Sequence, residues 1–308
     1  MMKGNQPLEP PAAQFYKQEI DGYELIPLSD GGLNYPTAMI LGNVPPEGAS
    51  QYDLPEGQMF IPYTLLLVRT EDNLVLNDVG AGDLGNPGDR IFPGLDHRTS
   101  RTNLLVPSLR AAGIDPGEIS TVLITHAHPD HVGGMLNADG NLVFPNARYY
   151  VAQREWDYWM SAGPSAVGAE ALRKHLEQLI ATAKTALNAI AARVTLVQGS
   201  EEVAPGIRFE ATYGHTPGHV MVSISSGGQT AYNISDVVVH PLFVEHPEWS
   251  PAIDMDAGQA DAARRRFFAR AAEENALVFG HHLGPFPNLG RIARRDDAWQ
   301  WLPVAMTG

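Results

Sequence analysis

The chain has 308 residues, of which 44% are hydrophobic and 18% charged, a composition typical of a globular protein with ample material for a core. Its formal net charge is −14 with only 21 Lys and Arg residues, which argues against a nucleic-acid partner because phosphate backbones are bound by clustered basic side chains. The absence of cysteine excludes disulfides and thiolate metal ligands, and no run approaches the ~18 apolar residues that span a membrane.

The N-terminal segment, residues 1–18, is polar and contains Pro7, Pro10 and Pro11, which oppose regular structure. We expect it to be a flexible arm. It has no apolar stretch of the kind found in a signal peptide, which predicts a cytoplasmic protein, although removal of an export signal would leave the same pattern. Residues 19–308 are expected to form a single domain, because the candidate site residues are spread widely along it.

Apolar runs separated by turn residues predict strands and helices along the whole chain. In the N-terminal half we expect a strand at residues 23–28, a long loop rich in Gly and Pro at 29–57, and a helix at 103–112. Residues 59–68 and 74–78 are two apolar runs separated by a short polar segment, which predicts a hairpin.

The C-terminal half continues the alternation. The expected strands are residues 144–153, 194–197, 207–211, 220–225, 230–234 and 276–279. The expected helices are residues 154–160, 169–193 and 261–274. The last of these helices carries the basic run Arg264–Arg266, which we expect to be a solvated helix face. The alternation of strands and helices indicates an α/β fold.

The most informative stretch follows a short apolar strand at residues 122–124. His126 and His128 are two residues apart, so in an extended segment both imidazoles can reach one metal ion at about 2.0–2.1 Å. Asp130 and His131 follow at a bend and can face a second ion. Histidines also cluster by chance or cap a helix, but this spacing directly after a strand favours a metal site.

Further candidate ligands lie at the ends of other expected strands. His215 lies in the sequence Gly-His-Thr-Pro-Gly-His, and Asp236 follows the strand at 230–234. His281 and His282 follow the last expected strand. Without cysteine, a metal must be held by imidazole and carboxylate groups, which suits zinc and also manganese, iron or cobalt.

The sequence His-x-His-x-Asp-His at residues 126–131 resembles the signature of the metallo-β-lactamase superfamily. This resemblance implies an αββα sandwich of two mixed β-sheets flanked by helices, with two divalent metal ions, zinc first among them. In that pattern one metal is bound by His126, His128 and His215, the other by Asp130, His131 and a late histidine, and Asp236 bridges both.

The segment from His282 onward, His-Leu-Gly-Pro-Phe-Pro, is similar to the His-Leu-Pro-Phe-Pro segment of the methyl parathion hydrolase and lactonase group, which implies His282 as the late ligand. Gly284 is one extra residue in this comparison and leaves His281 as the alternative. Asp78, in Asp-Val-Gly-Ala-Gly, resembles an Asp-x-Gly element whose aspartate orients the ligands without binding metal. A strand-ending turn residue is the alternative for Asp78.

The resemblance implies a metal-dependent hydrolase of lactones and esters, promiscuous toward organophosphate triesters, in which a hydroxide bridges the two metals. Asp130 and Asp236 are implied as catalytic residues, because they hold the geometry and can accept a proton. Trp159 is similar in position to an aromatic of the leaving-group pocket in that group. Together with Trp156 and His240 it forms the expected substrate pocket, although both tryptophans are equally suited to a core.

Three alternatives stay open. The chain could be a β-lactamase, a mononuclear iron thioesterase or dioxygenase of the same superfamily, or a non-catalytic binding member of it. The expected partner is a small apolar lactone or ester; neither nucleic acid nor a membrane is expected. A homodimer is compatible with the long N-terminal segment, by analogy only.

Overall fold

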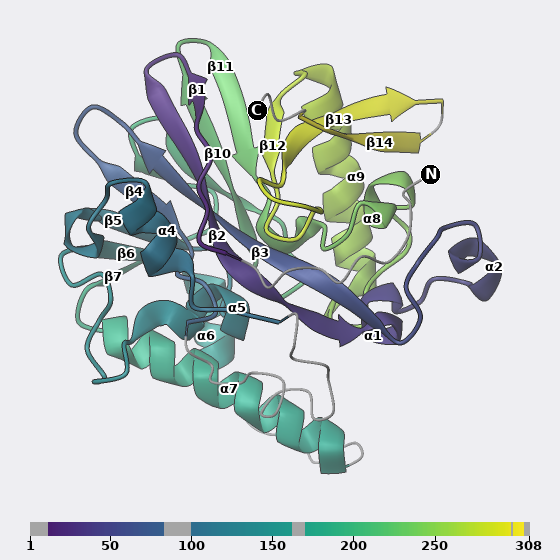
Figure 1. Cartoon of the computed structure of the whole chain (residues 1–308), viewed down its shortest axis with the longest axis horizontal. Coiled ribbons are helices and arrows are strands. Elements are labelled where there is room, and N and C mark those ends of the chain that lie inside the picture. Colours follow the sequence, from purple (N-terminus) through teal and green to yellow (C-terminus); the bar gives the residue numbers. More distant parts are fainter. Residues whose placement is uncertain (1–11, 83–99, 162–169, 297, 305–308) are drawn as a thin grey trace.

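The computed structural model describes residues 12–82, 100–161, 170–296 and 298–304, with the side chains of 170–175 excepted. Two β-sheets of seven strands each lie face to face, and helices cover the outer face of each sheet (Figure 1). The expected αββα sandwich is confirmed. Among the described residues, no helix combines the length and the apolar character needed to cross a membrane.

The first sheet has its strands in sequence order and is mixed. The strands from β1 to β4 pair antiparallel, whereas those from β4 to β7 pair parallel. Its members are β1 (Gln18–Ile20), β2 (Tyr23–Pro36), β3 (Gln58–Arg69), β4 (Leu74–Asn77), β5 (Thr121–Ile124), β6 (Arg148–Ala152) and β7 (Val194–Val197).

The second sheet is also in sequence order, and only β11 and β12 pair parallel. Its members are β8 (Glu202–Ala204), β9 (Ile207–Ala211), β10 (Val220–Ser226), β11 (Gln229–Asn233), β12 (Leu277–Phe279), β13 (Leu289–Arg295) and β14 (Ala298–Pro303). The strands β1, β8, β13 and β14 have no counterpart among the elements expected from the sequence.

The helices divide between the two outer faces and the loops. Those on the side of the first sheet are α4 (Leu105–Ala111), α5 (Pro129–Val132), α6 (Gln153–Ser161) and α7 (Glu170–Ile190). Those on the side of the second sheet are α8 (Leu242–Glu245) and α9 (Ala257–Glu273), while α1 (Thr37–Leu41) and α2 (Pro46–Ala49) follow the end of β2. The 3₁₀ turns are η2 (Pro116–Glu118), η3 (Gly133–Met135) and η4 (Ser235–Val237).

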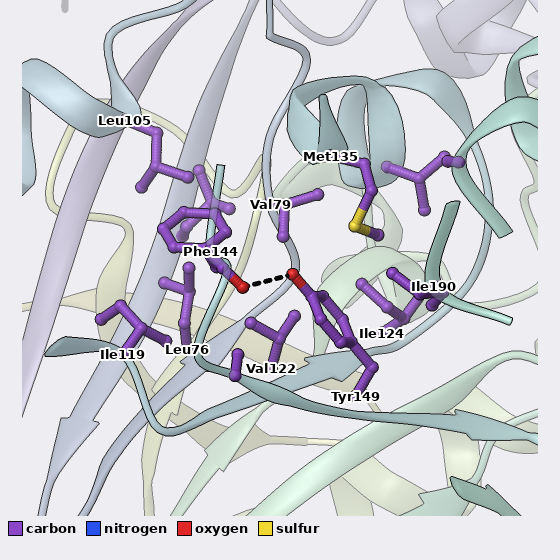
Figure 2. Packing of buried hydrophobic residues seen from close by; sticks show 14 of the residues in the cluster. Leu76, Val79, Leu105, Ile119, Val122, Ile124, Met135, Phe144, Tyr149 and Ile190 are labelled. Atoms are coloured by element: carbon purple, nitrogen blue, oxygen red, sulfur yellow. Dashed lines mark hydrogen bonds between the residues drawn. The ribbon is translucent and has the colours of Figure 1, made fainter. Parts of the chain in front are cut away.

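Strand β5 shows how the sequence builds both layers. Side chains alternate across a strand, so Val122 and Ile124 pack with the helices, whereas Leu123 packs between the sheets. Figure 2 shows the helix-side cluster, where the Tyr149 hydroxyl donates to the Phe144 carbonyl at 2.8 Å. Because both faces of β5 are buried, the strand is a fixed base for the histidine-rich loop that follows it.

The prediction of a loop at residues 29–57 is wrong for residues 29–36, which belong to β2. Strand β2 continues to Pro36, paired with β3, and the helices α1 and α2 follow. A bulge between Ser29 and Gly31 interrupts the register. Gly31 has φ +90°, and a Cβ there would lie 1.8 Å from the Arg101 carbonyl oxygen. The glycines therefore mark a bulge and a close approach of two backbones, not the end of the strand.

The expected arm at residues 1–18 is also shorter than predicted. The backbone N–H of Ser29 donates to Gln14, and that of Tyr16 donates to Pro27, each at 3.0 Å. Residue 18 already belongs to β1. The bulged β2 thus offers backbone partners that order the end of the arm, while residues 1–11 lie outside the described part of the chain.

Parallel pairing brings the polar strand ends together. Asp78 and Thr125 follow the neighbouring parallel strands β4 and β5, and Asp236 and His281 follow the parallel strands β11 and β12. The two sheets are also tied directly, because the Val220 N–H donates to the Thr125 carbonyl at 3.1 Å. Loops at one edge of both sheets therefore meet at a common site.

Candidate metal centre

The histidine-rich loop is shaped by Pro129. After β5 the chain bends at Thr125, and His128, the residue before the short helix α5, is extended with ψ 154°. Proline at the first helical position then starts the turn that contains Asp130 and His131. The loop thus presents its first two histidines from irregular backbone before the proline and its last two ligand candidates from a helical turn.

The first cluster contains His126, His128, His215 and Asp236, all buried. His126 Nε2 lies 3.1 Å from His128 Nδ1, which lies 2.9 Å from His215 Nε2. Asp236 Oδ2 lies 3.2 Å from His215 Nε2 and 3.9 Å from His126 Nε2. Donor atoms held at about 2.0–2.1 Å by a tetrahedral zinc ion are about 3.3 Å apart, so this set fits one zinc ion.

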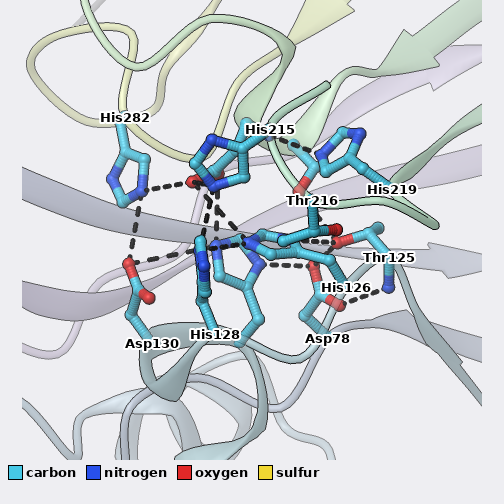
Figure 3. A network of polar contacts seen from close by, with 12 residues as sticks. Asp78, Thr125, His126, His128, Asp130, His215, Thr216, His219 and His282 are labelled. Atoms are coloured by element: carbon cyan, nitrogen blue, oxygen red, sulfur yellow. Dashed lines mark hydrogen bonds and ion pairs between the residues drawn. The ribbon is translucent and has the colours of Figure 1, made fainter. Parts of the chain in front are cut away.

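The second cluster contains Asp130, His131, His281 and His282 and lies beside the first. His282 Nε2 lies 3.3 Å from Asp130 Oδ2 and 3.4 Å from Asp236 Oδ2. His131 Nε2 lies 3.1 Å from Asp236 Oδ1 and 3.9 Å from Asp130 Oδ2. Asp236 therefore faces both clusters: its Oδ2 contacts His215 of the first and His282 of the second, and its Oδ1 contacts His131 of the second. Figure 3 shows His128 and His215 of the first cluster beside Asp130 and His282 of the second.

Two buried atoms at this junction are orphaned. Neither His131 Nε2 nor Asp236 Oδ1 makes a hydrogen bond to the described residues, although the two atoms face each other. Buried polar atoms without partners are rare and costly in folded proteins. A divalent cation that accepts both atoms as ligands would satisfy them, so the donor set fits a pair of metal ions.

The electrostatics of the cluster favour bound cations. Burial first of all lowers the pKa of His126 and that of His128, the latter to about 3, which keeps both imidazoles neutral. For Asp236, burial acts to raise the pKa, but the neighbouring His282, His131 and His215 hold it well below its usual range. The carboxylate stays ionised at neutral pH.

At His215 and His282 the effect of the carboxylates on the pKa exceeds that of burial. Burial lowers the pKa of His215 and of His282, yet Asp236 and its neighbouring carboxylates raise each to about 9. This site therefore attracts positive charge, which divalent cations supply with neutral imidazole ligands.

Asp78 lies behind the cluster and contacts one of the candidate ligands, His131. Its Oδ2 accepts from the Thr125 hydroxyl at 2.8 Å and lies 2.9 Å from His131 Nδ1, and its Oδ1 accepts from the Thr125 backbone N–H at 2.8 Å. A carboxylate on Nδ1 leaves Nε2 of His131 free to bind metal. Asp78 has φ 61°, a left-handed conformation, so its turn geometry and its contact with His131 occur together.

Glu155 is a supporting residue that sequence reasoning missed. It is fully buried in α6, and its carboxylate accepts from four donors on three segments. These donors are the N–H groups of Ala127 (3.0 Å) and Gly218 (3.0 Å), the Thr216 hydroxyl (2.7 Å) and Trp159 Nε1 (2.6 Å). Burial raises the pKa of Glu155, and these four donors oppose that rise. The residue ties the loop of His126 to the loop of His215.

Two more supporting residues, Asp254 and His219, were not assigned from the sequence. Asp254 Oδ1 lies 2.9 Å from His215 Nδ1. His219, the second histidine of Gly-His-Thr-Pro-Gly-His, pairs through Nδ1 with the Thr212 hydroxyl at 2.8 Å and accepts the Asp236 N–H on Nε2 at 3.3 Å. His219 was detectable as part of the motif; Asp254 is a single aspartate in a loop.

His281 and His282 differ in their surroundings. Both are buried, but His282 Nε2 approaches two carboxylates and its Nδ1 donates to the Pro62 carbonyl at 2.8 Å. The His281 ring stacks on Tyr63 with centroids 5.5 Å apart and packs on His131, and its Nε2 has no hydrogen-bond partner among the described residues. The geometry favours His282, the choice implied by the Pro-Phe-Pro resemblance.

A cavity of about 390 Å³ opens above the cluster. Its floor is polar and its walls are mainly apolar. His128, Asp130, Asp236 and His282 lie at the floor, and the walls include Leu33, Ile61, Val239 and Ile253. Tyr35 and Tyr63 also line the cavity, with their hydroxyls hydrogen-bonded to each other. Such a site fits a small ligand with an apolar body and one polar reacting group.

The predicted pocket residues do not line this cavity. Trp159 is buried in the helix-side core, where its indole donates to Glu155 and its ring lies edge-on to His128 at 5.8 Å. Trp156 packs against the same core. His240 is not a wall residue either; its Nδ1 accepts the Leu242 N–H at 3.2 Å, and burial lowers its pKa to about 4. Both tryptophans therefore pack in the core.

The αββα sandwich and the two clusters of histidine and aspartate at its loop edge together describe a class of protein with a centre for two metal ions. The profile of the metallo-β-lactamase superfamily matches residues 64–282, and the chain belongs to that superfamily. The predicted class, a metal-dependent hydrolase with lactonase relatives, is confirmed.

Several relatives are similar over most of their length. The N-acyl homoserine lactonase of Bacillus cereus is 22% identical over 238 residues, which cover 74% of this chain and 84% of that protein. The solved structure of AidC, a dizinc quorum-quenching lactonase in complex with a product, is 27% identical, with a TM-score of 0.84 over 96% of this chain and 99% of that one. Hydrolase AbOPH is 25% identical, with a TM-score of 0.81 over 97% and 100% of the two chains.

Proposed function

We propose that this protein hydrolyses lactones, N-acyl homoserine lactones first among them, at a centre of two divalent metal ions, with zinc as the expected metal. One observation carries the proposal: two ligand clusters share Asp236 at the floor of an apolar cavity. The similarity to the dizinc lactonase AidC and to N-acyl homoserine lactonases of Bacillus supports this substrate class.

We assign the ligands in two sets. His126, His128 and His215 bind one ion, Asp130, His131 and His282 bind the other, and Asp236 bridges them. The spacing of the donor atoms and the two orphaned atoms at the junction support this assignment. His281 is the alternative to His282.

When bound, the two cations would supply Lewis acidity toward water and toward the substrate carbonyl. The protein does the rest. The apolar walls hold the acyl chain and exclude bulk water, so that charges at the floor act in a medium of low polarity. The neutral imidazoles and the ionised carboxylate of Asp236 keep the floor in one arrangement.

Asp130 is the better placed of the two aspartates for proton transfer. Both side chains line the cavity, but that of Asp130 is 14% exposed, whereas that of Asp236 is 2% exposed and is faced by four histidines. Overall, water adds to the carbonyl carbon, the ring C–O bond breaks, and one proton of the water is passed to the ring oxygen. We assign that transfer to the carboxylate of Asp130.

A substrate panel tests the proposal. The purified protein would be assayed with N-acyl homoserine lactones of several chain lengths, an aryl lactone, an aryl ester, a phosphotriester and a β-lactam, with metal content measured in parallel. We expect two metal ions per chain and turnover of the acyl lactones that is lost in Asp236→Ala. A fully metal-loaded protein that hydrolyses the β-lactam but no lactone would refute the substrate class.

The same panel tests promiscuity toward organophosphate triesters, which stays a prediction. The single domain at residues 19–308 is likewise proposed, and the shared core between the two sheets supports it. The homodimer and the cytoplasmic location stay predictions, checked by light scattering and by cell fractionation.

A further inference from the structure

A buried arginine lies behind one of the proposed metal ligands. Arg264 is on α9 and is only 1% exposed, one of the largest fully buried side chains. The basic run Arg264–Arg266 was expected to be a solvated helix face. This holds for Arg265 and Arg266, which are exposed, but is wrong for Arg264. A buried guanidinium is retained only where its charge and its donors are matched.

Arg264 is fully matched by one loop. Its Nη1 donates to Asp254 Oδ2 at 3.1 Å, its Nε to the Pro247 carbonyl at 3.0 Å, and its Nη2 to the Ser250 hydroxyl at 2.6 Å. The guanidinium therefore fixes the loop at three points. The charged partner among them, Asp254, has a side chain that is 1% exposed.

The other oxygen of Asp254 faces the metal centre. Asp254 Oδ1 lies 2.9 Å from His215 Nδ1, so the chain of contacts runs from Arg264 through Asp254 to His215. The backbone repeats this connection, because Met255 N–H donates to the His215 carbonyl at 3.2 Å and Asp256 N–H donates to the Gly214 carbonyl at 2.9 Å.

We propose that Asp254 and Arg264 are positioning residues for His215. The Asp254 carboxylate accepts a hydrogen bond from Nδ1–H, which fixes the tautomer and directs Nε2 toward Asp236 and His128. Arg264 holds that carboxylate in the required orientation by occupying its second oxygen. The inference rests on the proposed assignment of His215 as a metal ligand and is independent of the substrate.

The pair has a second consequence, because Asp254 lies in the cavity wall between Ile253 and Met255. Asp254 therefore borders both the cavity and the candidate ligand His215.

The test is stepwise removal of metal from the holoenzyme. Wild-type protein, Arg264→Met, Asp254→Asn and the exposed control Arg266→Met would be titrated with a chromophoric chelator, with metal counted at each step. In Arg264→Met the carboxylate loses its cationic partner. In Asp254→Asn the side-chain amide has only one acceptor oxygen for two donors, His215 Nδ1–H and Arg264. Its NH₂ group must therefore face one of these donors, whichever way the amide is turned.

We expect one of the two metal ions to leave Arg264→Met and Asp254→Asn at a chelator concentration about 10–100-fold lower than in the wild type, with the other ion much less affected. Arg266→Met should match the wild type. A purely structural role would lower the melting temperature and leave the ratio of the two release midpoints unchanged, which would overturn the inference. If Arg264→Met does not fold, Asp254→Asn decides.

The outcomes also separate this inference from the proposed function. A wild-type protein that holds fewer than two metal ions contradicts the proposed centre itself. A wild-type protein with two ions, and variants that release both as the wild type does, contradicts only the role of Asp254 and Arg264.

Discussion

Replacement of Glu155 by glutamine tests whether a buried carboxylate holds the two metal-binding loops together. Glutamine keeps the size and shape of the side chain but has one acceptor oxygen in place of two. In the present structure one oxygen accepts from Ala127 and Trp159, and the other from Thr216 and Gly218. The amide NH₂ group must therefore face one of these pairs of donors.

The loss of stability depends on which of the four donors can change its hydrogen bonding. The Thr216 hydroxyl can rotate and accept from the amide, but a backbone N–H cannot. We expect the NH₂ group to turn toward Thr216 and Gly218, which leaves the Gly218 N–H buried without an acceptor. One such donor costs about 1–3 kcal/mol, so the free energy of unfolding should fall by about that amount.

Urea unfolding of the metal-loaded protein, followed by far-UV circular dichroism, measures this loss. The matched control is Asp157→Asn, the same carboxylate-to-amide change at an exposed residue of the same helix. We also expect Glu155→Gln to bind metal more weakly, because Ala127 lies between His126 and His128. A variant as stable as Asp157→Asn, with unchanged metal affinity, would refute the reasoning.

Three further predictions concern the surroundings of the site. Burial raises the pKa of Asp30 from 3.8 to about 6, so its carboxyl stabilises the fold most below about pH 4 and loses about 3 kcal/mol of that contribution as the pH rises through 6. The free energy of unfolding of the wild type relative to Asp30→Asn, measured in urea, should fall by this amount between about pH 4 and pH 7; a constant difference would contradict it. Asp78→Asn should lower metal affinity about 10–100-fold in chelator competition, because it weakens the hold on His131, and an unchanged affinity would contradict that role. Val239→Phe should reduce kcat/KM at least about tenfold more for a long-chain acyl lactone than for a short one; equal effects would show that the chain does not occupy the cavity.

The parts of the site predicted well from the sequence are local. His126, His128, Asp130 and His131 lie within six residues, after a strand whose apolar side chains face both layers. Short spacing and alternation are properties of the sequence itself, so their consequences can be worked out before the fold is known.

The parts that were missed depend on distant partners. Strand β2 was expected to end at residue 28, because residues 29–57 are rich in Gly and Pro. The strand continues because β3 pairs with it and because the Asp30 carboxylate accepts the N–H groups of Ala81, Leu104 and Leu105. These partners are 51 to 75 residues away, and no local pattern announces them.

The burial of Arg264 also depends on distant residues and could not be predicted from the sequence. Three consecutive arginines on a helix look alike in the sequence, yet the helix turns only one of them toward the core. Which one is buried depends on where Asp254 lies, and Asp254 is placed by its pairing with His215. The charge run is visible in the sequence, but its one buried member is not.

The proposed centre holds two metal ions that share Asp236, and anomalous diffraction from crystals of the metal-loaded protein tests this most directly. We expect two peaks about 3.5–4 Å apart, one among His126, His128 and His215 and the other among Asp130, His131 and His282. A single peak, or a second ion bound by His281 and not by His282, would contradict the ligand assignment.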